Sequence, residues 1–409
     1  MKLLLLLSSL VSLTSAALWL PNQQRPLDKP SHVPPHSDEL PLAPPKLPNH
    51  HLLALHAKLC EIESISGNEA GVGHYLAAYL KKKLNLTVEL QPVHPKPSLF
   101  NLKHGISVKP SKRFNVLAYP GTTRQTRALL SSHIDTVPPY LHYRRTPSGE
   151  IWGRGSVDAK GSVAAQVTAL HDLLSSGEIS EGDVGLLFVV GEETVGDGMT
   201  AANDLGIPWE TVIFGEPTDK KLACGHKGML GFTIHTYGKT GHSGYPWLAV
   251  SANELLIKAL VALQKVEFPA SEKYGETTVN IGRISGGVAA NVIPEKGEAK
   301  IAVRLAGGNV EDVKRKVVEA VESVGEGMVE VEFTMTGYEP VDIDCDVDGF
   351  DTITVNYGTD IPHLKGNYKR YLYGPGDILV AHSDHEHLTV GDLEEAVEGY
   401  KGLVRASLK

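Results

Sequence analysis

The chain has 409 residues, of which 42% are hydrophobic and 21% charged, and its formal net charge at pH 7 is −9. A chain of this length can bury a large core and typically forms two domains. The negative charge, with no basic cluster beyond Lys81–Lys83, argues against nucleic acid as a partner.

The N-terminus has the pattern of a secretory signal peptide. Lys2 precedes a short apolar stretch that ends in the small residues Ser15, Ala16 and Ala17. The stretch is too short to cross a bilayer, and no other run approaches the ~20 apolar residues of a membrane span. We therefore expect residues 1–17 to be a signal peptide, and the mature protein to be secreted, extracellular and free of membrane anchors.

Residues 18–49 are rich in proline, including Pro34-Pro35 and Pro44-Pro45. Such a segment is extended and cannot build a core, so we expect an arm or a propeptide. The sequon Asn85-Leu86-Thr87 predicts glycosylation of Asn85 in an exported eukaryotic protein.

The cysteines Cys60, Cys224 and Cys345 are too few for a disulfide framework. They allow one disulfide at most and leave at least one thiol over. The sequence does not say which two would pair.

Helix and strand patterns alternate from residue 50 to residue 227, which indicates a doubly wound, mainly parallel sheet. A helical period begins near His50 and runs to Ile62. The further expected elements are helices at 71–84 and 160–174, and strands at 127–132, 184–190 and 211–214.

A different order follows between residues 228 and 336. Strands are expected at 230–237, 277–284, 298–305 and 328–335, with helices at 248–266 and 310–324. The order βαββαβ is that of a ferredoxin-like module. Helix and strand signals resume in residues 337–409, so we expect an α/β catalytic domain (50–227 and 337–409) interrupted by an inserted α+β lid.

Residues with the chemistry of metal ligands follow the expected strands of the catalytic domain. His133 ends one strand, Glu192-Glu193 and Glu216 follow two others, and Asp158 lies in a glycine-rich turn. Imidazole nitrogen and carboxylate oxygen are zinc ligands, and sites in parallel sheets form beyond the carboxyl ends of strands. With His382 these residues would make two three-ligand sets that share Asp158.

Some roles stay open on this evidence. One residue of the Glu192-Glu193 pair can bind metal while the other holds the attacking water as general base. Asp135 can accept a hydrogen bond from the second ring nitrogen of His133. His385 and His387 compete with His382 for the ligand role.

The motifs taken together resemble one family. They are Ser-His-Ile-Asp-Thr-Val-Pro (132–138), Gly-Arg-Gly-Ser-Val-Asp-Ala-Lys-Gly (153–161), Gly-Glu-Glu (191–193), Gly-Glu-Pro-Thr (215–218) and the spacing from His382 to Glu386. The chain is similar, from about residue 50 to its end, to the dinuclear zinc exopeptidases and amidohydrolases that include aminoacylase, acetylornithine deacetylase, succinyl-diaminopimelate desuccinylase and glutamate carboxypeptidase.

The resemblance implies two zinc ions per subunit. One would be held by His133, Asp158 and Glu216, and the other by Asp158, Glu193 and His382. It also implies that Glu192 is the base and that His382 is the ligand in preference to its neighbours.

The resemblance extends to the lid. Gly241-His242-Ser243 looks like a family segment whose His reaches the active site of a neighbouring subunit in a homodimer. Asn291 and Arg304 resemble residues that bind the substrate's carboxylate and carbonyl, although a turn and a strand surface would also explain them. The family's usual Trp and Pro-Phe pair is replaced here by residues 140–145, which leaves side-chain specificity open.

The expected function is that of a secreted zinc-dependent carboxypeptidase which hydrolyses small peptides that have a free carboxylate. The alternative is an N-acyl-amino-acid deacylase with the same chemistry. A non-catalytic binding protein on the same scaffold is disfavoured, because every ligand position and the base position are filled.

Overall fold

The computed structural model describes residues 50–94 and 112–409. The predicted signal peptide and proline-rich segment therefore lie outside the described residues. Within the described part, no helix has the length and apolar character needed to cross a membrane.

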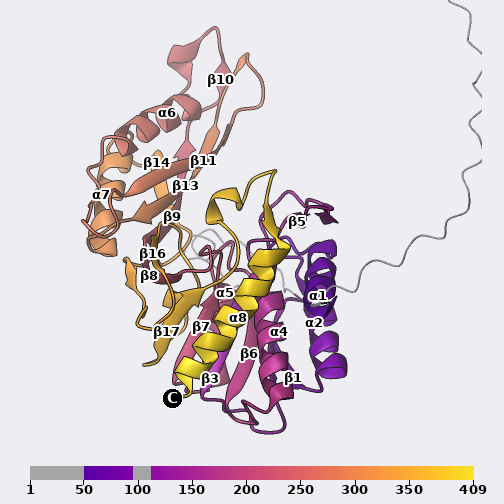
Figure 1. The fold of residues 1–409 in the computed structure, drawn as a ribbon. Coiled ribbons are helices and arrows are strands. Elements are labelled where there is room, and N and C mark those ends of the chain that lie inside the picture. The colour runs from indigo at the N-terminus through magenta and orange to yellow at the C-terminus, as the bar shows by residue number, and fades with distance from the viewer. Residues whose placement is uncertain (1–49, 95–111) are drawn as a thin grey trace, which may run out of the picture. The chain divides into compact units, whose positions relative to one another are not determined.

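The catalytic domain is built on a mixed sheet with the strand order β1-β2-β6-β3-β7-β17 (Figure 1). Strands β6, β3, β7 and β17 run parallel, whereas β1 and β2 are antiparallel additions at one edge. The strands are β1 (Thr87–Pro92), β2 (Phe114–Tyr119), β3 (Ala128–His133), β6 (Val184–Val189), β7 (Thr211–Gly215) and β17 (Lys369–Tyr373). The predicted mainly parallel sheet is thus confirmed.

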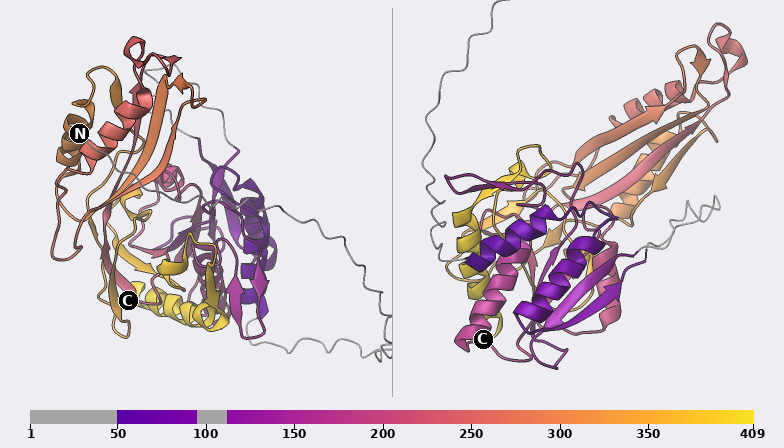
Figure 2. Two further views of the ribbon diagram at one scale, coloured as in Figure 1. Left: turned by 90° about the horizontal axis from the view of Figure 1, so that it is seen from above. Right: turned by 90° about the vertical axis from the view of Figure 1, so that its right-hand side faces the viewer.

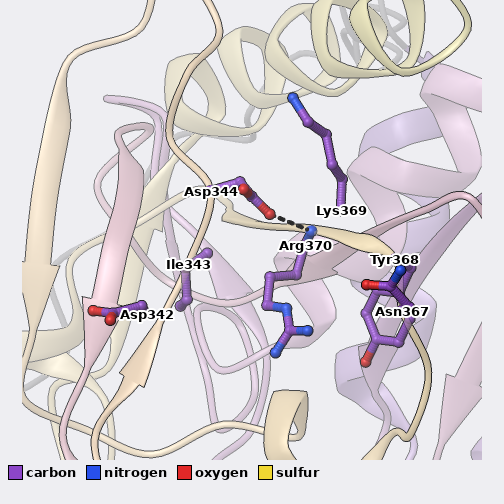
Figure 3. Close-up of a pocket in the computed structure, with 7 residues that line it drawn as sticks. All are labelled: Asp342, Ile343, Asp344, Asn367, Tyr368, Lys369 and Arg370. Atoms are coloured by element: carbon purple, nitrogen blue, oxygen red, sulfur yellow. Dashed lines mark hydrogen bonds between the residues drawn. The ribbon is translucent and has the colours of Figure 1, made fainter.

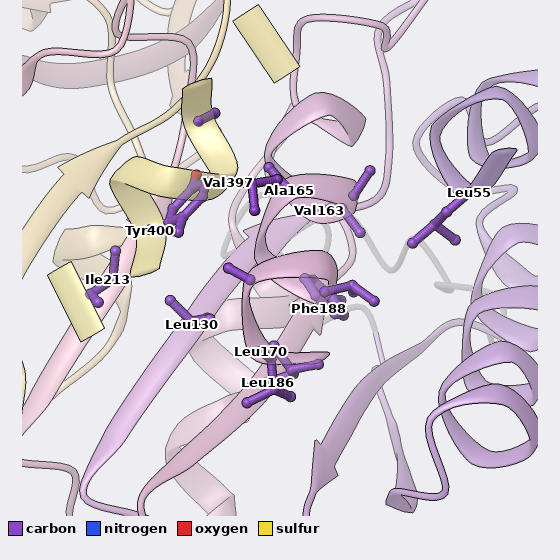
Figure 4. Packing of buried hydrophobic residues seen from close by; sticks show 14 of the residues in the cluster. Leu55, Leu130, Val163, Ala165, Leu170, Leu186, Phe188, Ile213, Val397 and Tyr400 are labelled. Atoms are coloured by element: carbon purple, nitrogen blue, oxygen red, sulfur yellow. The ribbon is translucent and has the colours of Figure 1, made fainter. Parts of the chain in front are cut away.

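Each face of this sheet has its own core, because successive side chains of a strand point to opposite faces. Leu130, Leu186 and Phe188 pack against helices on one face (Figure 4), whereas Leu129 and Leu187 belong to the core of the other face. The helices of the first face are α1 (His50–Glu61), α2 (Ala70–Lys83), α4 (Lys160–Ser176) and α8 (Val390–Ser407), with α4 and α8 side by side. The second face is covered by α5 (Asp197–Ala202), η1 (Asn203–Leu205) and residues after the inserted domain.

The inserted domain is a four-stranded antiparallel sheet of order β11-β13-β9-β14 with two helices on one face (Figure 2). Its elements in chain order are β9 (Gly228–Tyr237), α6 (Ala252–Leu263), β11 (Thr278–Gly286), β13 (Lys296–Leu305), α7 (Val310–Glu322) and β14 (Val329–Phe333). The expected βαββαβ order is confirmed. Helix α6 begins later than expected because Ser251 caps it, its side chain accepting from the backbone N–H of Glu254.

Short elements complete the described chain. They are β4 (Arg144–Arg145), β5 (Glu150–Trp152), β8 (Leu222–His226), β10 (Gly241–His242), η2 (Pro246–Leu248), β12 (Val292–Ile293), β15 (Val341–Asp342), β16 (Thr352–Val355), η3 (Ile361–His363), η4 (Ile378–Val380) and β18 (His387–Thr389). A disulfide joins Cys224 of β8 to Cys345, and Cys60 is a buried free thiol.

Candidate metal centre

Three neighbouring parallel strands bring acidic and imidazole side chains to one edge of the catalytic sheet. His133 is the last residue of β3, Glu216 directly follows β7, and Glu192 and Glu193 come shortly after β6. Because β6, β3 and β7 are adjacent and parallel, their carboxyl ends meet at the same edge. This common edge explains why residues as far apart in sequence as His133 and Glu216 converge there.

The side chains form two groups with a shared member. His133, Asp158 and Glu216 make one group and Asp158, Glu193 and His382 the other, and within each group the candidate ligand atoms lie within 4.8 Å of one another. His133 Nε2 lies 3.1 Å from Asp158 Oδ1. His382 Nε2 lies 3.2 Å from Asp158 Oδ2 and 3.0 Å from Glu193 Oε2. The two oxygens of Asp158 therefore face two different histidines, as a bridging carboxylate requires.

His382 reaches this cluster from the loop between η4 and β18. The two candidate histidines that follow it, His385 in the same loop and His387 at the start of β18, join neither group among the described residues. His385 Nδ1 lies 2.9 Å from Asp384, and the ring of His387 stacks on Trp152 with 4.4 Å between centroids. Of these three histidines, His382 is therefore the one that forms a group with Asp158 and Glu193.

Asp135 holds the chain segments that carry these residues. Its carboxylate accepts from the backbone N–H groups of Glu192 and Glu193, at 3.2 Å each, and from Ser66 Oγ at 2.7 Å. Nδ1 of His133 lies 3.0 Å from the main-chain oxygen of Asp135 and 3.6 Å from its carboxylate. The main-chain oxygen is thus the nearer partner of the His133 ring, and the carboxylate mainly positions the Glu192-Glu193 loop.

The cluster has an excess of buried negative charge. Burial, followed by the charge of Glu216, raises the pKa of Glu192 well above its usual value. Burial likewise raises the pKa of Glu216 to about 7. Hydrogen bonds to Asp158 and Glu193 raise the pKa of His382 to about 10.

A divalent cation is the natural partner for such a donor set. Among the described residues, none of the ion pairs formed by Asp158, Glu193 or Glu216 involves a Lys or Arg. Imidazole nitrogens and carboxylate oxygens are the ligands of zinc in hydrolases. The residues therefore fit two adjacent metal ions that share Asp158.

The three candidate substrate-binding residues lie on the inserted domain, in two separate places. His242 and Asn291 are exposed, and the Asn291 carbonyl accepts from the N–H of Ser243, next to His242. Arg304 is near the far end of β13, eight residues beyond Lys296, or roughly 27 Å of extended strand. One chain therefore does not bring His242 and Arg304 together within this domain.

Two buried groups near the cluster were not assigned a role from the sequence. Glu386 is 1% exposed and lies 2.6 Å from the guanidinium of Arg154. Asp360 is 5% exposed, and its Oδ1 has no hydrogen-bond partner among the described residues. The Gly-Thr-Asp sequence at 358–360 contains no local pattern that would have identified this acid.

A cavity of about 550 Å³ lies at the start of β17 (Figure 3). The candidate metal ligands lie at the opposite, carboxyl ends of the parallel strands. Its charged residues already have partners. Lys369 pairs with Asp346 and Asp342 with Lys273, while the Arg370 guanidinium lies 5.2 Å from the ring of Tyr368. We assign no function to this cavity.

Comparison with known proteins identifies the family. A peptidase dimerisation domain of the M20 type matches residues 224–329. A "Peptidase M20 domain-containing protein" of Sordaria macrospora is 47% identical over 384 residues, which cover 88% of this chain and 85% of the relative. The chain belongs to the M20 peptidase family.

Other M20 relatives are named for their activity. A "Probable carboxypeptidase" of Aspergillus fumigatus is 46% identical over 387 residues, 87% of either chain. Human carnosine dipeptidase 1 has the same fold, with a TM-score of 0.68 and 16% identity over 88% of this chain and 96% of that one. An M20 family metallo-carboxypeptidase of Sulfolobus solfataricus gives a TM-score of 0.64 and 17% identity over 87% and 99%. The M20 chain described here is accordingly a metallopeptidase with a dimerisation domain.

Proposed function

We propose that this M20 protein is a secreted carboxypeptidase which uses two zinc ions to hydrolyse small peptides that have a free C-terminal carboxylate. The observation that carries the proposal is the position of Asp158, whose two oxygens face His133 and His382 separately. The names of the curated relatives support the carboxypeptidase activity. The pattern of residues 1–17 supports secretion.

The five ligand roles follow from the two groups. His133 and Glu216 would hold one ion, Glu193 and His382 the other, and Asp158 both. When bound, two zinc ions would polarise a substrate carbonyl and lower the pKa of a bound water molecule.

Glu192 has a different role because it belongs to neither group. It is next to Glu193 on the loop that Asp135 holds. As the general base, Glu192 accepts a proton from the attacking water and delivers it to the nitrogen of the leaving amine. Asp135 acts through the position of this loop and of His133.

The substrate's carboxylate would be recognised by Arg304, with Asn291 of the neighbouring subunit, which lies beside that subunit's His242, at the carbonyl. A guanidinium donates two parallel hydrogen bonds to a carboxylate, which suits a residue that selects the C-terminal end of a peptide. Deacylation of N-acyl amino acids needs the same groups and is the alternative that the substrate test must separate.

The first test compares substrates and variants of the zinc-loaded protein. We expect hydrolysis of N-blocked dipeptides with a free carboxylate, much slower hydrolysis of their C-terminal amides, and slower turnover of N-acetyl amino acids. Faster turnover of the N-acetyl amino acids would instead make the protein a deacylase.

The matched variants Glu192→Gln and Glu193→Gln test the two roles within one loop. Glu192→Gln should lose on the order of 10²–10⁴-fold in kcat and keep its metal, because removal of a base spares the ligands. Glu193→Gln should lose metal. Near-normal activity of Glu192→Gln, or loss of metal from that variant alone, would show that the assignments are wrong.

We also propose that the protein is a homodimer in which His242 of one subunit completes the active site of the other. The exposure of His242 and its separation from Arg304 along the inserted domain support this arrangement. An imidazole there would donate a hydrogen bond to the oxyanion of the tetrahedral intermediate.

Mixed dimers test this role of His242. The inactive variants His242→Ala and Glu192→Gln should partly restore activity when refolded together, since a mixed dimer has one intact composite site. Mixed dimers that form but remain inactive, or a fully active monomer, would exclude the arrangement.

A further inference from the structure

We propose that Glu386 is a positioning residue which fixes the backbone of Asp158 and thereby sets the affinity of both metal sites. This inference rests on the proposed function, because it takes Asp158 as the shared ligand. It concerns a residue that contacts neither group of candidate ligand atoms with its own carboxylate.

Both oxygens of Glu386 are directed at the segment that carries Asp158. Oε1 accepts from the backbone N–H of Val157 at 3.0 Å and from that of Asp158 at 3.2 Å. Oε2 accepts from Arg154 Nη1 at 2.6 Å. Both oxygens are therefore acceptors for this turn, and Glu386 is in neither group of candidate ligands among the described residues.

The main chain strengthens the same connection. The carbonyl of Glu386 accepts from the N–H of Gly153, and β18 pairs with β5 in the register His387↔Trp152. Residues 152–158 are therefore tied to the segment that also carries His382. Glu386 thus links the shared ligand Asp158 to a ligand of the second group.

The energetics favour positioning over simple stabilisation. Arg154 and Glu386 are 2% and 1% exposed, so the pair carries the full cost of removing two charges from water. A buried ion pair is often no more stabilising than apolar residues of the same volume. The backbone N–H groups of Val157 and Asp158, by contrast, require an acceptor, because a buried donor without a hydrogen-bond partner costs free energy.

A matched pair of double variants isolates the acceptor. Arg154→Met with Glu386→Gln removes both charges but leaves an amide oxygen for the Val157 and Asp158 N–H groups. Arg154→Met with Glu386→Leu removes the charges and the acceptor at similar volume. The two proteins therefore differ mainly in whether the Asp158 segment is held.

The measurements are the two zinc dissociation constants, by competition with a chromophoric chelator, and the visible spectrum of the cobalt-substituted protein. We expect the Leu variant to bind both ions on the order of 10–100-fold more weakly than the Gln variant, with an altered cobalt spectrum. Circular dichroism of the metal-free proteins checks that both are folded. A purely structural role would lower the melting temperature without changing either dissociation constant.

Equal affinity of the two double variants for both ions would overturn the inference. Weaker binding of only one of the two ions by the Leu variant would also overturn it. If the Leu variant does not fold, Glu386→Asp replaces it, since the shorter side chain keeps its charge but cannot reach Arg154 and both N–H groups. Wild-type affinity in Glu386→Asp would then overturn the inference. Failure of the proposed function is distinguishable, because wild-type protein would then bind no pair of ions or show no peptidase activity.

Discussion

Removal of the disulfide between Cys224 and Cys345 should destabilise the protein without changing its site. The two cysteines are 121 residues apart in sequence, and the loop between them contains all of β9 to β14. A crosslink of this length restricts the unfolded chain, and the chain-entropy relation gives about 5 kcal/mol. Measured losses for native disulfides are typically about 2–5 kcal/mol, so we expect a value in that range.

The folded state should tolerate the change because β8 is held by backbone pairs as well. It pairs with β15 in the register Val341↔His226 and with β16 in the register Thr352↔Leu222. Cys224→Ser/Cys345→Ser should therefore retain wild-type kcat and metal content at room temperature. The change should be confined to the free energy of unfolding.

The assay is unfolding in urea, followed by circular dichroism at a fixed zinc concentration. The phosphine reductant TCEP, which has no thiol, provides a matched control, since it should lower the wild-type midpoint to that of the double serine variant and leave the variant's midpoint unchanged. The reasoning is refuted if the free energies of unfolding of the oxidised wild type and the variant agree within about 0.5 kcal/mol. It is also refuted if thiol titration of the unfolded wild type finds three free cysteines.

Three further predictions concern metal content, acid stability and glycosylation. Asp158→Ala should release both zinc ions, whereas Glu216→Ala and His382→Ala should each release mainly one. Elemental analysis of the purified variants measures this, and two full equivalents of zinc in Asp158→Ala would exclude the bridging role. Burial lowers the pKa of His226 to about 4, so the unfolded chain takes up this proton near pH 6.5 and the folded one only near 4. Between pH 7 and 4 the free energy of unfolding of the metal-free wild type should fall by about 3 kcal/mol more than that of His226→Gln. Urea unfolding at several pH values measures this, and an equal decrease in the two proteins would contradict the prediction. Asn85 is exposed, so protein from a eukaryotic host should lose mass on treatment with peptide N-glycosidase, and Asn85→Gln should not.

The sequence predicted best what local periodicity encodes. His133, Glu193 and Glu216 follow short apolar strands, and parallel strands bring their carboxyl ends to one edge. Strand β1 was not expected, because it is half-exposed and mixed in polarity and so shows no buried run. Strand β2 was also missed, although it is buried along its whole length. The order of the inserted domain was predictable because each of its strands and helices has its own pattern.

Contacts between distant segments could not be predicted in this way. Arg154 and Glu386 are 232 residues apart in the chain, and the local sequence around each does not indicate that it is buried. The pairing of Cys224 with Cys345 was equally open, since three cysteines allow three pairs. Asp135 was expected to orient His133. Its contacts to the N–H groups of Glu192 and Glu193 were not expected, because they depend on the pairing of β6 with β3.

The inserted domain divides the site between an early and a late part of the chain. His133, Asp158, Glu193 and Glu216 precede it, and only His382 follows it. The group around Glu216 thus comes entirely from the first part, whereas the group around Glu193 needs the segment after residue 336. That segment docks through pairing of β17 with β7 and of β18 with β5. Because Glu386 is on the same segment and holds the Asp158 backbone, the first group also depends on the late part of the chain, although none of its ligands comes from there.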